Sequence, residues 1–509
     1  MGLKSILFSE EYTLKETEPD FFRDVNLHYI IDMMRVYTPG YDAAKLFYTF
    51  PVSEETMKLR HVVFFDLDRN PGFREAAVYF GHFMRKAAGM MELAEKSEDE
   101  IKRAGFHMRA AGNYLTAVKL FSEALSDMKF TSPALLECRE HIGCVCRELT
   151  GGGFEEAYRE CVRMWDSVAY RMSVKNGEIS LIRDKQSSFE PEKNYLKDIA
   201  ALLKVPFDEE TDILPSVFKN PLATTCLEET VAALIKRSEP GVYESAKSFM
   251  HSYPSFFDCD ILRYEQELQF YIASLQFRDE TERKGKVMCF PAERIDASFM
   301  GVGVYDVVML WQAGSKFEVV ANDFEFPDKP SFLIVTGPNG GGKTTFARSL
   351  GQAVYFAMMG MPVNAELFTL PNMVGIMTHF ENEENLFDNA GKLKDEINRL
   401  IPMVKGSEGG RFVILNELFT TATTKDALVM GQKITEIFIK RGDFGVYVTH
   451  MSELAGKDDA LKSMVAETVG TDNRRTYRII PDKPKGLGFS DALVRQYELT
   501  YDDIMRVLP

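Results

Sequence analysis

One stretch of this chain, residues 332–359, restricts the fold more than any other. Four apolar residues of strand type, residues 332–335, lead into a glycine-rich loop, and residues that favour a helix follow. Glycines let successive backbone N–H groups point inward and let the chain approach a polyphosphate closely, and the helix adds the positive end of its dipole. The pattern therefore predicts a phosphate-binding loop, with a chance glycine-rich turn as the alternative.

The loop fits the pattern G-x-x-x-x-G-K-[ST] at every position. Lys343 is expected to reach the β- and γ-phosphates of a nucleotide, and the Thr344 hydroxyl is expected to bind Mg²⁺. The residues predicted to hold ATP are Gly337, Pro338, Asn339, Gly340, Gly341, Gly342, Lys343, Thr344 and Thr345.

Two further apolar strands end in polar residues. Residues 411–415 are followed by Asn416 and Glu417, and residues 445–449 are followed by His450. A P-loop ATPase needs a strand whose end holds the Mg²⁺ shell and a base that orients the attacking water. Glu417 is the predicted base, Asn416 a predicted Mg²⁺ ligand without charge, and His450 a predicted sensor of the γ-phosphate. An ordinary strand end and a structural histidine are the alternatives.

These residues resemble the ATPase domain of the MutS family of DNA mismatch-repair proteins. The resemblance covers about residues 322–454 and is much more specific than the generic loop pattern, which ABC-type ATPases share. It implies an ATP-hydrolysing domain that uses Mg²⁺, that pairs with a second copy through the ATPase domains, and that acts on DNA. The matching segments, in the family's order and spacing, are residues 336–345, 360–366, 376–378, 415–417, 423–426 and 449–454.

The departures from the family also carry information. The family has Asp-Glu where this chain has Asn416-Glu417, so weaker Mg²⁺ binding and slow turnover are expected. Residues 419–424 keep hydroxyl groups but lack the family's arginine and glycines. Gly391 stands near the place of a family serine that reaches the partner subunit's nucleotide, and Val319 replaces an aromatic residue that stacks on adenine.

The chain has 509 residues, which is too long for a single core. Helical periodicity prevails at the start, so the predicted fold class is α + α/β. A helical lever or core domain is expected at 1–295, and a P-loop, ABC-like ATPase domain with a mostly parallel sheet at 296–509. A hairpin is predicted near 173–182, with an irregular loop as the alternative. Early strands of the second domain are predicted at 304–310 and 317–320.

Charge and composition argue against some partners. The net charge of −16 does not favour DNA binding, because sequence-independent affinity for DNA comes from Lys and Arg, and no basic run occurs. Seven cysteines without a C-x-x-C pair indicate reduced thiols and no zinc ribbon. No signal peptide and no run of about 18 apolar residues occurs, so we expect a cytoplasmic protein without a membrane span.

The sequence is compatible with two main functions. The resemblance implies a dimeric ATP-driven switch that acts on DNA, in mismatch repair or in recombination on branched DNA. We expect no counterpart of the family's mismatch-reading, connector and clamp domains and no appended nuclease domain in this sequence. The alternative is a slow ATP-dependent latch that binds proteins and does not recognise DNA directly. An ABC-type motor would need a Leu-Ser-Gly-Gly-Gln loop, which the sequence lacks.

Overall fold

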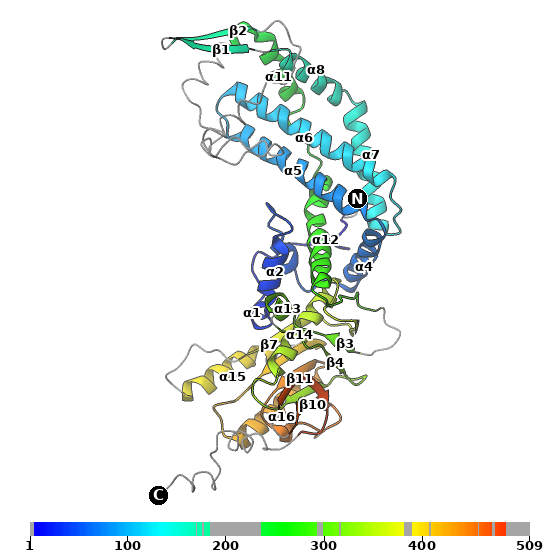
Figure 1. The fold of residues 1–509 in the computed structure, drawn as a ribbon, viewed down its shortest axis with the longest axis vertical. Coiled ribbons are helices and arrows are strands. Elements are labelled where there is room, and N and C mark those ends of the chain that lie inside the picture. The colour runs from blue at the N-terminus through cyan, green and yellow to red at the C-terminus, as the bar shows by residue number, and fades with distance from the viewer. Residues whose placement is uncertain are drawn as a thin grey trace. The chain divides into compact units, whose positions relative to one another are not determined.

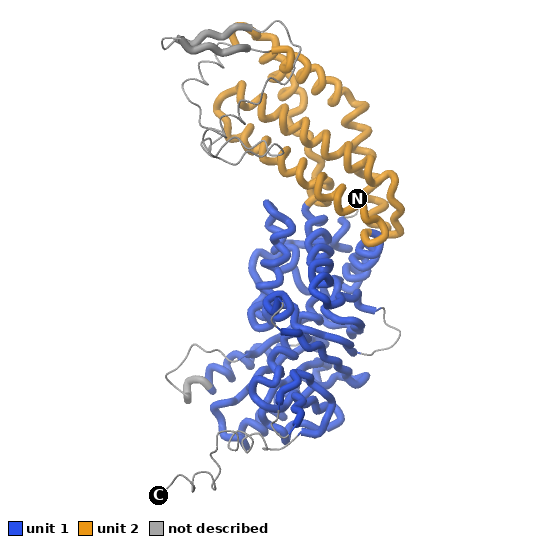
Figure 2. Tube along the Cα trace, viewed as in Figure 1, with its two compact units in different colours: residues 1–66, 266–509 blue, residues 67–265 orange. Residues whose placement is uncertain are grey.

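The computed structural model describes residues 5–168, 170–175, 178–183, 236–292, 299–314, 317–380, 389–406, 409–456, 458–470 and 474–484. The chain divides into two compact units (Figure 2). Unit 1 comprises residues 1–66 and 266–509, and unit 2 comprises residues 67–265. The predicted domain boundary after residue 295 lies within 293–298, outside the described residues, so it stays a prediction. No helix in the described part of the chain has the length and apolar composition that a membrane span needs.

The described part of unit 2 consists of long helices and a hairpin. Ser132 caps the helix that begins at Pro133, because its hydroxyl accepts a hydrogen bond from the Leu135 amide. The predicted hairpin is confirmed, with Ser173 opposite Ser180, and its turn lies outside the described residues. The elements are α5 (Gly72–Lys96), α6 (Glu100–Ser126), α7 (Pro133–Gly151), α8 (Phe154–Asp166), β1 (Tyr170–Lys175), β2 (Glu178–Arg183) and α11 (Pro240–Ser252).

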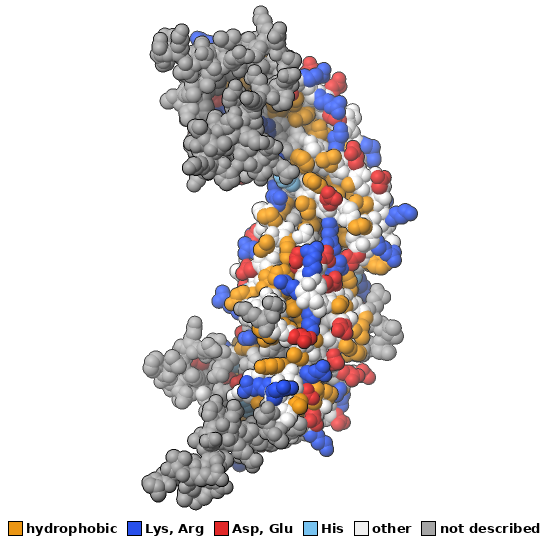
Figure 3. Space-filling model, in the orientation of Figure 1, with side chains coloured by type: hydrophobic (Ala, Val, Ile, Leu, Met, Phe, Trp, Pro, Cys, Tyr) orange, Lys and Arg blue, Asp and Glu red, His pale blue; other side chains and the backbone are white. Residues whose placement is uncertain are grey.

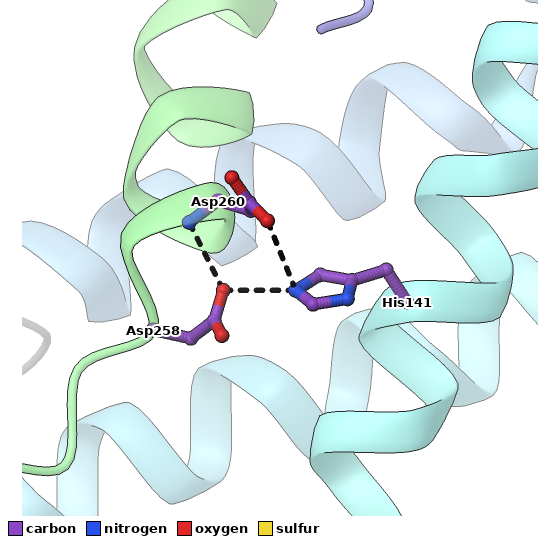
Figure 4. A group of neighbouring side chains, drawn as sticks. All are labelled: His141, Asp258 and Asp260. Carbon is purple, nitrogen blue, oxygen red and sulfur yellow. Dashed lines mark hydrogen bonds and ion pairs between the residues drawn. The ribbon is translucent and has the colours of Figure 1, made fainter. Parts of the chain in front are cut away.

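A His–Asp–Asp group in unit 2 joins α7 to the start of α12 (Cys259–Arg283), as Figure 4 shows. His141 Nε2 lies 2.9 Å from Asp258 Oδ1 and 3.9 Å from Asp260 Oδ2. Asp258 Oδ1 also accepts the amides of residues 260 and 261, both at 3.0 Å, which caps the helix. Asp260 pairs with Arg263 at 3.0 Å. The group is therefore explained as a helix cap with ion pairs.

Unit 1 contains a six-stranded sheet in the order β11-β10-β5-β9-β8-β7. Neighbouring strands from β10 to β7 are parallel, and β11 lies antiparallel to β10 at the edge. This confirms the α + α/β class and the mostly parallel sheet. The strands are β5 (Phe332–Thr336), β7 (Gly375–His379), β8 (Arg411–Asn416), β9 (Phe444–Val448), β10 (Leu461–Val469) and β11 (Arg474–Pro481). Helices α14 (Lys343–Met358), α15 (Asn389–Lys405) and α16 (Thr424–Lys440) connect them, and the short η2 (Ser452–Leu454) follows β9.

A second, three-stranded sheet in unit 1 has the order β4-β3-β6. It consists of β3 (Met300–Val304), β4 (Asn322–Glu325) and β6 (Leu367–Thr369). The predicted strand at 304–310 is wrong, because β3 ends at Val304 and α13 (Val307–Ala313) follows. Asp306 causes the change, since its carboxylate accepts the Met309 amide at 2.8 Å and starts the helix. The strand predicted at 317–320 is also absent from the described residues, and β4 begins only at Asn322.

Helix α14 holds the N-terminal segments of unit 1, which form α1 (Phe21–Asp24), α2 (Leu27–Arg35), α3 (Ala44–Tyr48) and α4 (Glu54–Arg69). Residues 348, 352 and 355 share one face of α14, because they follow helical spacing. Each donates a hydrogen bond to a backbone carbonyl of these segments. The bonds are Arg348 Nε to Asp24 O (3.0 Å), Gln352 Nε2 to Val25 O (3.0 Å) and Tyr355 OH to Phe47 O (2.6 Å).

Arg60 on α4 is fully buried at the other end of α14. Its guanidinium donates to the carbonyl of Leu7 at 3.0 Å and to the carbonyl of Met359 at 2.9 Å, just after the end of α14. It also lies over the rings of Phe8 and Phe270, at 5.0 and 4.6 Å from their centroids. Burial lowers the pKa of Arg60 to about 10, so the group stays charged at neutral pH. The negative end of the helix dipole also stabilises a cation at this position.

We expect Arg60→Ala to lower the free energy of unfolding by about 3 kcal/mol or more. The substitution removes two hydrogen bonds from a charged donor, at about 1.5–3 kcal/mol each, and leaves a cavity. Urea unfolding followed by circular dichroism measures the change. Lys58→Ala is the matched control on the same helix, since the Lys58 side chain is 69% exposed and its loss is expected to cost less than about 0.5 kcal/mol. Equal effects of the two substitutions would contradict the role given to Arg60.

Candidate functional site

The candidate site lies where three neighbouring parallel strands end. In the sheet β5 pairs with β9, and β9 pairs with β8, all in parallel. Three other strands of the same sheet, β7, β10 and β11, are labelled in Figure 1. The carboxyl ends of parallel strands meet at one edge of a sheet, where ligands bind in open α/β folds. The glycine-rich loop follows β5, Glu417 follows β8, and His450 comes shortly after β9. The topology therefore brings the three predicted motifs to one edge.

The loop has the backbone that its glycines permit. Gly337, Gly340 and Gly342 have positive φ values of 130°, 67° and 92°. A methyl group added to Gly337 would lie 2.8 Å from Cβ of Ala466, so β10 packs directly on the loop. A side chain there would displace the loop from the sheet. The loop is thus a close-fitting turn of bare backbone, open to an anion at the start of α14.

Lys343 and Thr344 begin α14 with their polar groups directed into the site. Lys343 is buried, and its Nζ donates to the carbonyls of Gly337 and Pro338 at 3.0 and 3.1 Å. Burial lowers the pKa of Lys343, the charge of Glu417 opposes this, and the charge of Arg475 adds to it. Thr344 Oγ1 donates to Asn416 Oδ1 at 3.1 Å. The two residues predicted to bind Mg²⁺ are therefore hydrogen-bonded neighbours.

Glu417 and His450 also lie together. His450 Nε2 is 3.4 Å from Glu417 Oε1, and the hydrogen bond from His450 lowers the pKa of the Glu417 carboxyl. Glu417 has a positive φ of 53°, an uncommon backbone conformation for a residue with a side chain. Its amide donates to the Val448 carbonyl at 2.9 Å, which fixes the turn to β9. A carboxylate is thereby held ionised at the strand edge.

The segment after Glu417 is fixed by packing. Phe419 is 2% exposed and belongs to a core cluster with residues of α15 and α16. Its amide donates to Glu396 Oε1 at 2.8 Å. Thr423 then caps α16 by accepting the Asp426 amide at 3.2 Å. A buried aromatic ring therefore anchors this segment, in which the family's glycines and arginine are missing.

A cavity of about 390 Å³ opens beside the loop. Phe317 and Tyr477 lie on its rim, half exposed, and both are aromatic. Val319 is buried at 3% exposure and does not line this cavity. The cavity is lined by Tyr305, Asp306, Met309, Phe317, Glu318, Val320, Asn322, Gly342, Thr345, Phe346, Ser349 and Tyr477.

Of the residues that line the cavity, the sequence predicted only Gly342 and Thr345 as part of the site. Tyr477 comes to the loop through a positive φ of 61° inside β11, which no sequence pattern announces. Phe317 lies only two residues before Val319, the position at which the family has an aromatic residue that stacks on adenine. Gly391 lies in the first turn of α15, within residues 389–392 whose side chains are outside the described set.

The donor set fits a nucleoside polyphosphate and a hard divalent cation. A buried ammonium and a loop of bare amides suit phosphate oxygens, and a hydroxyl beside an amide oxygen suits Mg²⁺. A cavity with aromatic residues on its rim, next to the loop, has the volume range of a small-molecule site.

Comparison with known proteins identifies this region. Residues 333–480 match the family model of MutS domain V. Endonuclease MutS2 of Thermus thermophilus is 27% identical over 192 residues, which are 37% of this chain and 26% of that protein. The DNA mismatch repair protein MutS of Lactococcus lactis is 30% identical over 145 residues, which are 28% of this chain and 17% of that protein. The mitochondrial DNA mismatch repair protein MSH1 of Arabidopsis thaliana is 26% identical over 157 residues, or 30% of this chain and 14% of that protein.

The matched stretches thus cover about a quarter or less of the length of these relatives. The residues that match the family model, 333–480, include the loop, the strand ends and nearly all of the six-stranded sheet described above. Residues 333–480 therefore match domain V of the MutS family, and this part of the chain is similar to MutS and MutS2 proteins.

Proposed function

We propose that the chain is an ATP-binding and ATP-hydrolysing conformational switch of the MutS type. The observation that carries the proposal is the convergence of the loop, the Thr344–Asn416 pair and the Glu417–His450 pair at one strand edge. These are the parts that phosphoryl transfer to water requires: a phosphate cradle, a metal site and a group that orients water.

In this proposal each residue of the site has a distinct part. Lys343 would exchange its two carbonyl partners for the β- and γ-phosphates, and Thr344 and Asn416 are the residues that would hold Mg²⁺. The ion, when bound, would supply positive charge to the phosphate oxygens. Glu417 accepts a hydrogen bond from the attacking water, and His450 keeps that carboxylate ionised and in place. Asn416 contributes an oxygen but no charge, which favours slow turnover.

The cavity beside the loop is the proposed nucleoside site. Thr345 and Gly342 line it, so a nucleotide with its phosphates in the loop would place its base in the cavity. Phe317 and Tyr477 offer rings on which a base can stack, a contact that is worth about 1–3 kcal/mol per base in nucleic-acid binders. They replace the missing aromatic residue at position 319.

Helix α14 is the proposed route from the nucleotide to the rest of unit 1. Its first turn is part of the loop, and its polar face is bonded to the N-terminal segments. A shift of the loop therefore also acts on the backbone of α1 and α3 through rigid hydrogen bonds. We propose that ATP favours one arrangement of these helices and that hydrolysis releases it.

We also propose that the chain works in the cytoplasm as a dimer, through its ATPase domains, and acts on DNA in mismatch repair or on branched DNA in recombination. The names of the relatives in mismatch repair support this part of the proposal. The charge distribution favours the alternative of a slow latch for a protein partner. Basic and acidic side chains are interspersed over the described surface in Figure 3, and the net charge is −16. The two functions differ in whether DNA changes the ATPase rate.

Lys343→Ala is expected to lower ATP affinity more than about 100-fold. The substitution removes charge-assisted hydrogen bonds to two phosphates, at about 1.5–3 kcal/mol each. Isothermal titration calorimetry with ATP and Mg²⁺ measures the loss. Lys440→Ala, an exposed lysine on α16, is the control and should bind ATP as the wild type does. Retained ATP affinity in Lys343→Ala would refute the site.

Asn416→Asp is expected to raise the hydrolysis rate. It should also lower the Mg²⁺ concentration that gives half of the maximal rate by about tenfold, because a carboxylate binds the ion more strongly than an amide does. The steady-state rate over a Mg²⁺ titration tests this, with Glu417→Gln as the blank. An unchanged rate and unchanged Mg²⁺ dependence would remove Asn416 from the metal site.

A further inference from the structure

A second cation lies against the phosphate-binding loop. A methyl group added to Gly340 would be 3.0 Å from Nη1 of Arg475, 3.4 Å from its Cζ and 3.8 Å from its Nη2. The guanidinium therefore lies in close contact with the loop backbone at Gly340, and a side chain there would have to push it aside. Gly340 has a φ of 67° and no side chain, so the loop is shaped to admit Arg475.

The bulge in β11 explains how Arg475 reaches the loop. Thr468 pairs with Arg475 and Ala466 pairs with Ile479, so β11 has extra residues between these pairs and bends away from β10. Thr476 holds the bulge, because its hydroxyl lies 2.9 Å from Glu467 Oε2 and 3.2 Å from the Glu467 carbonyl. The bulge thus directs Arg475 to the loop.

Tyr477 is placed by the same bulge. It lies against Gly342, where an added methyl group would be 3.5 Å from the Tyr477 carbonyl oxygen. Arg475 and Tyr477, two residues apart on β11, therefore lie next to Gly340 and Gly342 of the loop. Tyr477 lines the nucleoside cavity. Arg475 lies against Gly340, two residues before Gly342 in the loop. Bulges that redirect side chains are common next to functional sites.

Arg475 lies beside a second positive charge, that of Lys343. Its side chain is exposed and makes no hydrogen bond or ion pair among the described residues. Its charge acts on the buried Lys343 ammonium as a like charge. Besides the Glu417 carboxylate, an anion of several charges between the two cations would be attracted by both of them and by the backbone N–H groups of the loop. A planar guanidinium also suits two oxygens of one phosphate better than an ammonium does.

We propose that Arg475 is a second phosphate-binding residue of the nucleotide site and acts beside Lys343 on a nucleoside polyphosphate. The inference rests on the proposed function, because it assigns a further contact to the same ligand. Arg475 is supplied by the same chain, from the antiparallel edge strand that follows β10, outside the three motifs that the sequence identifies. Its expected contribution is to affinity, through charge-assisted hydrogen bonds to phosphate oxygens.

The test compares the ATP affinities of five proteins, the wild type, Arg475→Gln, Arg475→Lys, Arg478→Gln and Lys343→Ala, by isothermal titration calorimetry in Mg²⁺. Arg475→Gln should weaken ATP binding by about tenfold or more, the loss expected for a hydrogen bond from a charged donor. Arg475→Lys should recover part of the loss, since it restores the charge without the fork. Arg478→Gln, an exposed arginine on the same strand, should bind as the wild type does. The salt dependence of ATP affinity should also be shallower in Arg475→Gln.

The outcomes separate the two proposals. An Arg475→Gln protein that binds ATP within twofold of the wild type, while Lys343→Ala does not bind, overturns the role of Arg475 and leaves the proposed function standing. Wild-type protein that binds no ATP overturns the proposed function itself. Equal losses in Arg475→Gln and Arg478→Gln would show a general effect of surface charge and would also overturn the assignment. Thermal unfolding of each variant checks that the strand still folds.

Discussion

Helix α14 is the element on which the rest of unit 1 depends. Its N-terminus is the end of the glycine-rich loop, and Arg60 holds the carbonyl of the residue that follows its C-terminus. Between these ends it packs on the sheet so closely that a methyl group on Gly351 would lie 2.7 Å from both Ile414 and Val25. The helix thus joins the sheet, the N-terminal segments and the loop in one packed body, and a change at any of the three must be accommodated by the others.

The site itself follows from strand order. Placing β5 beside β9 and β9 beside β8 brings the loop, His450 and Glu417 to one edge, although long segments separate the strands in the sequence. The antiparallel β10–β11 pair then closes one side of the loop, because Ala466 packs under Gly337 and β11 follows the loop from Gly340 to Gly342. The carboxyl ends of the parallel strands therefore carry the proposed catalytic residues, and the β10–β11 pair forms the side wall of the loop.

Much of this could be predicted from the sequence, because the signals are local. A strand, a glycine-rich loop and a helix in direct succession identify the loop, and polar residues after apolar strands identify Glu417 and His450. The strand predicted at 304–310 was wrong because a single helix-capping residue outweighs the apolar pattern around it. Apolar residues 304–310 look like a strand, but Asp306 caps a helix within them.

Other features could not be predicted because they depend on distant contacts. The burial of Arg60 rests on carbonyls of residues 7 and 359, which only the fold brings together. The placement of Tyr477 and Arg475 rests on a bulge with a positive φ at a tyrosine, a conformation that its residue type disfavours. Strain of this kind persists only where the surrounding structure imposes it, and it is often found at functional sites.

The central claim is that this strand edge hydrolyses ATP as a switch that acts on DNA. The most direct measurement is the ATP hydrolysis rate of the purified chain without DNA and with homoduplex, mismatched and branched duplexes, with Glu417→Gln as the blank. The account predicts a slow rate above the blank that at least one of these DNAs raises. A rate equal to that of the blank would contradict ATP hydrolysis at this site, and a rate that no DNA changes would contradict the action on DNA and support a latch for a protein partner.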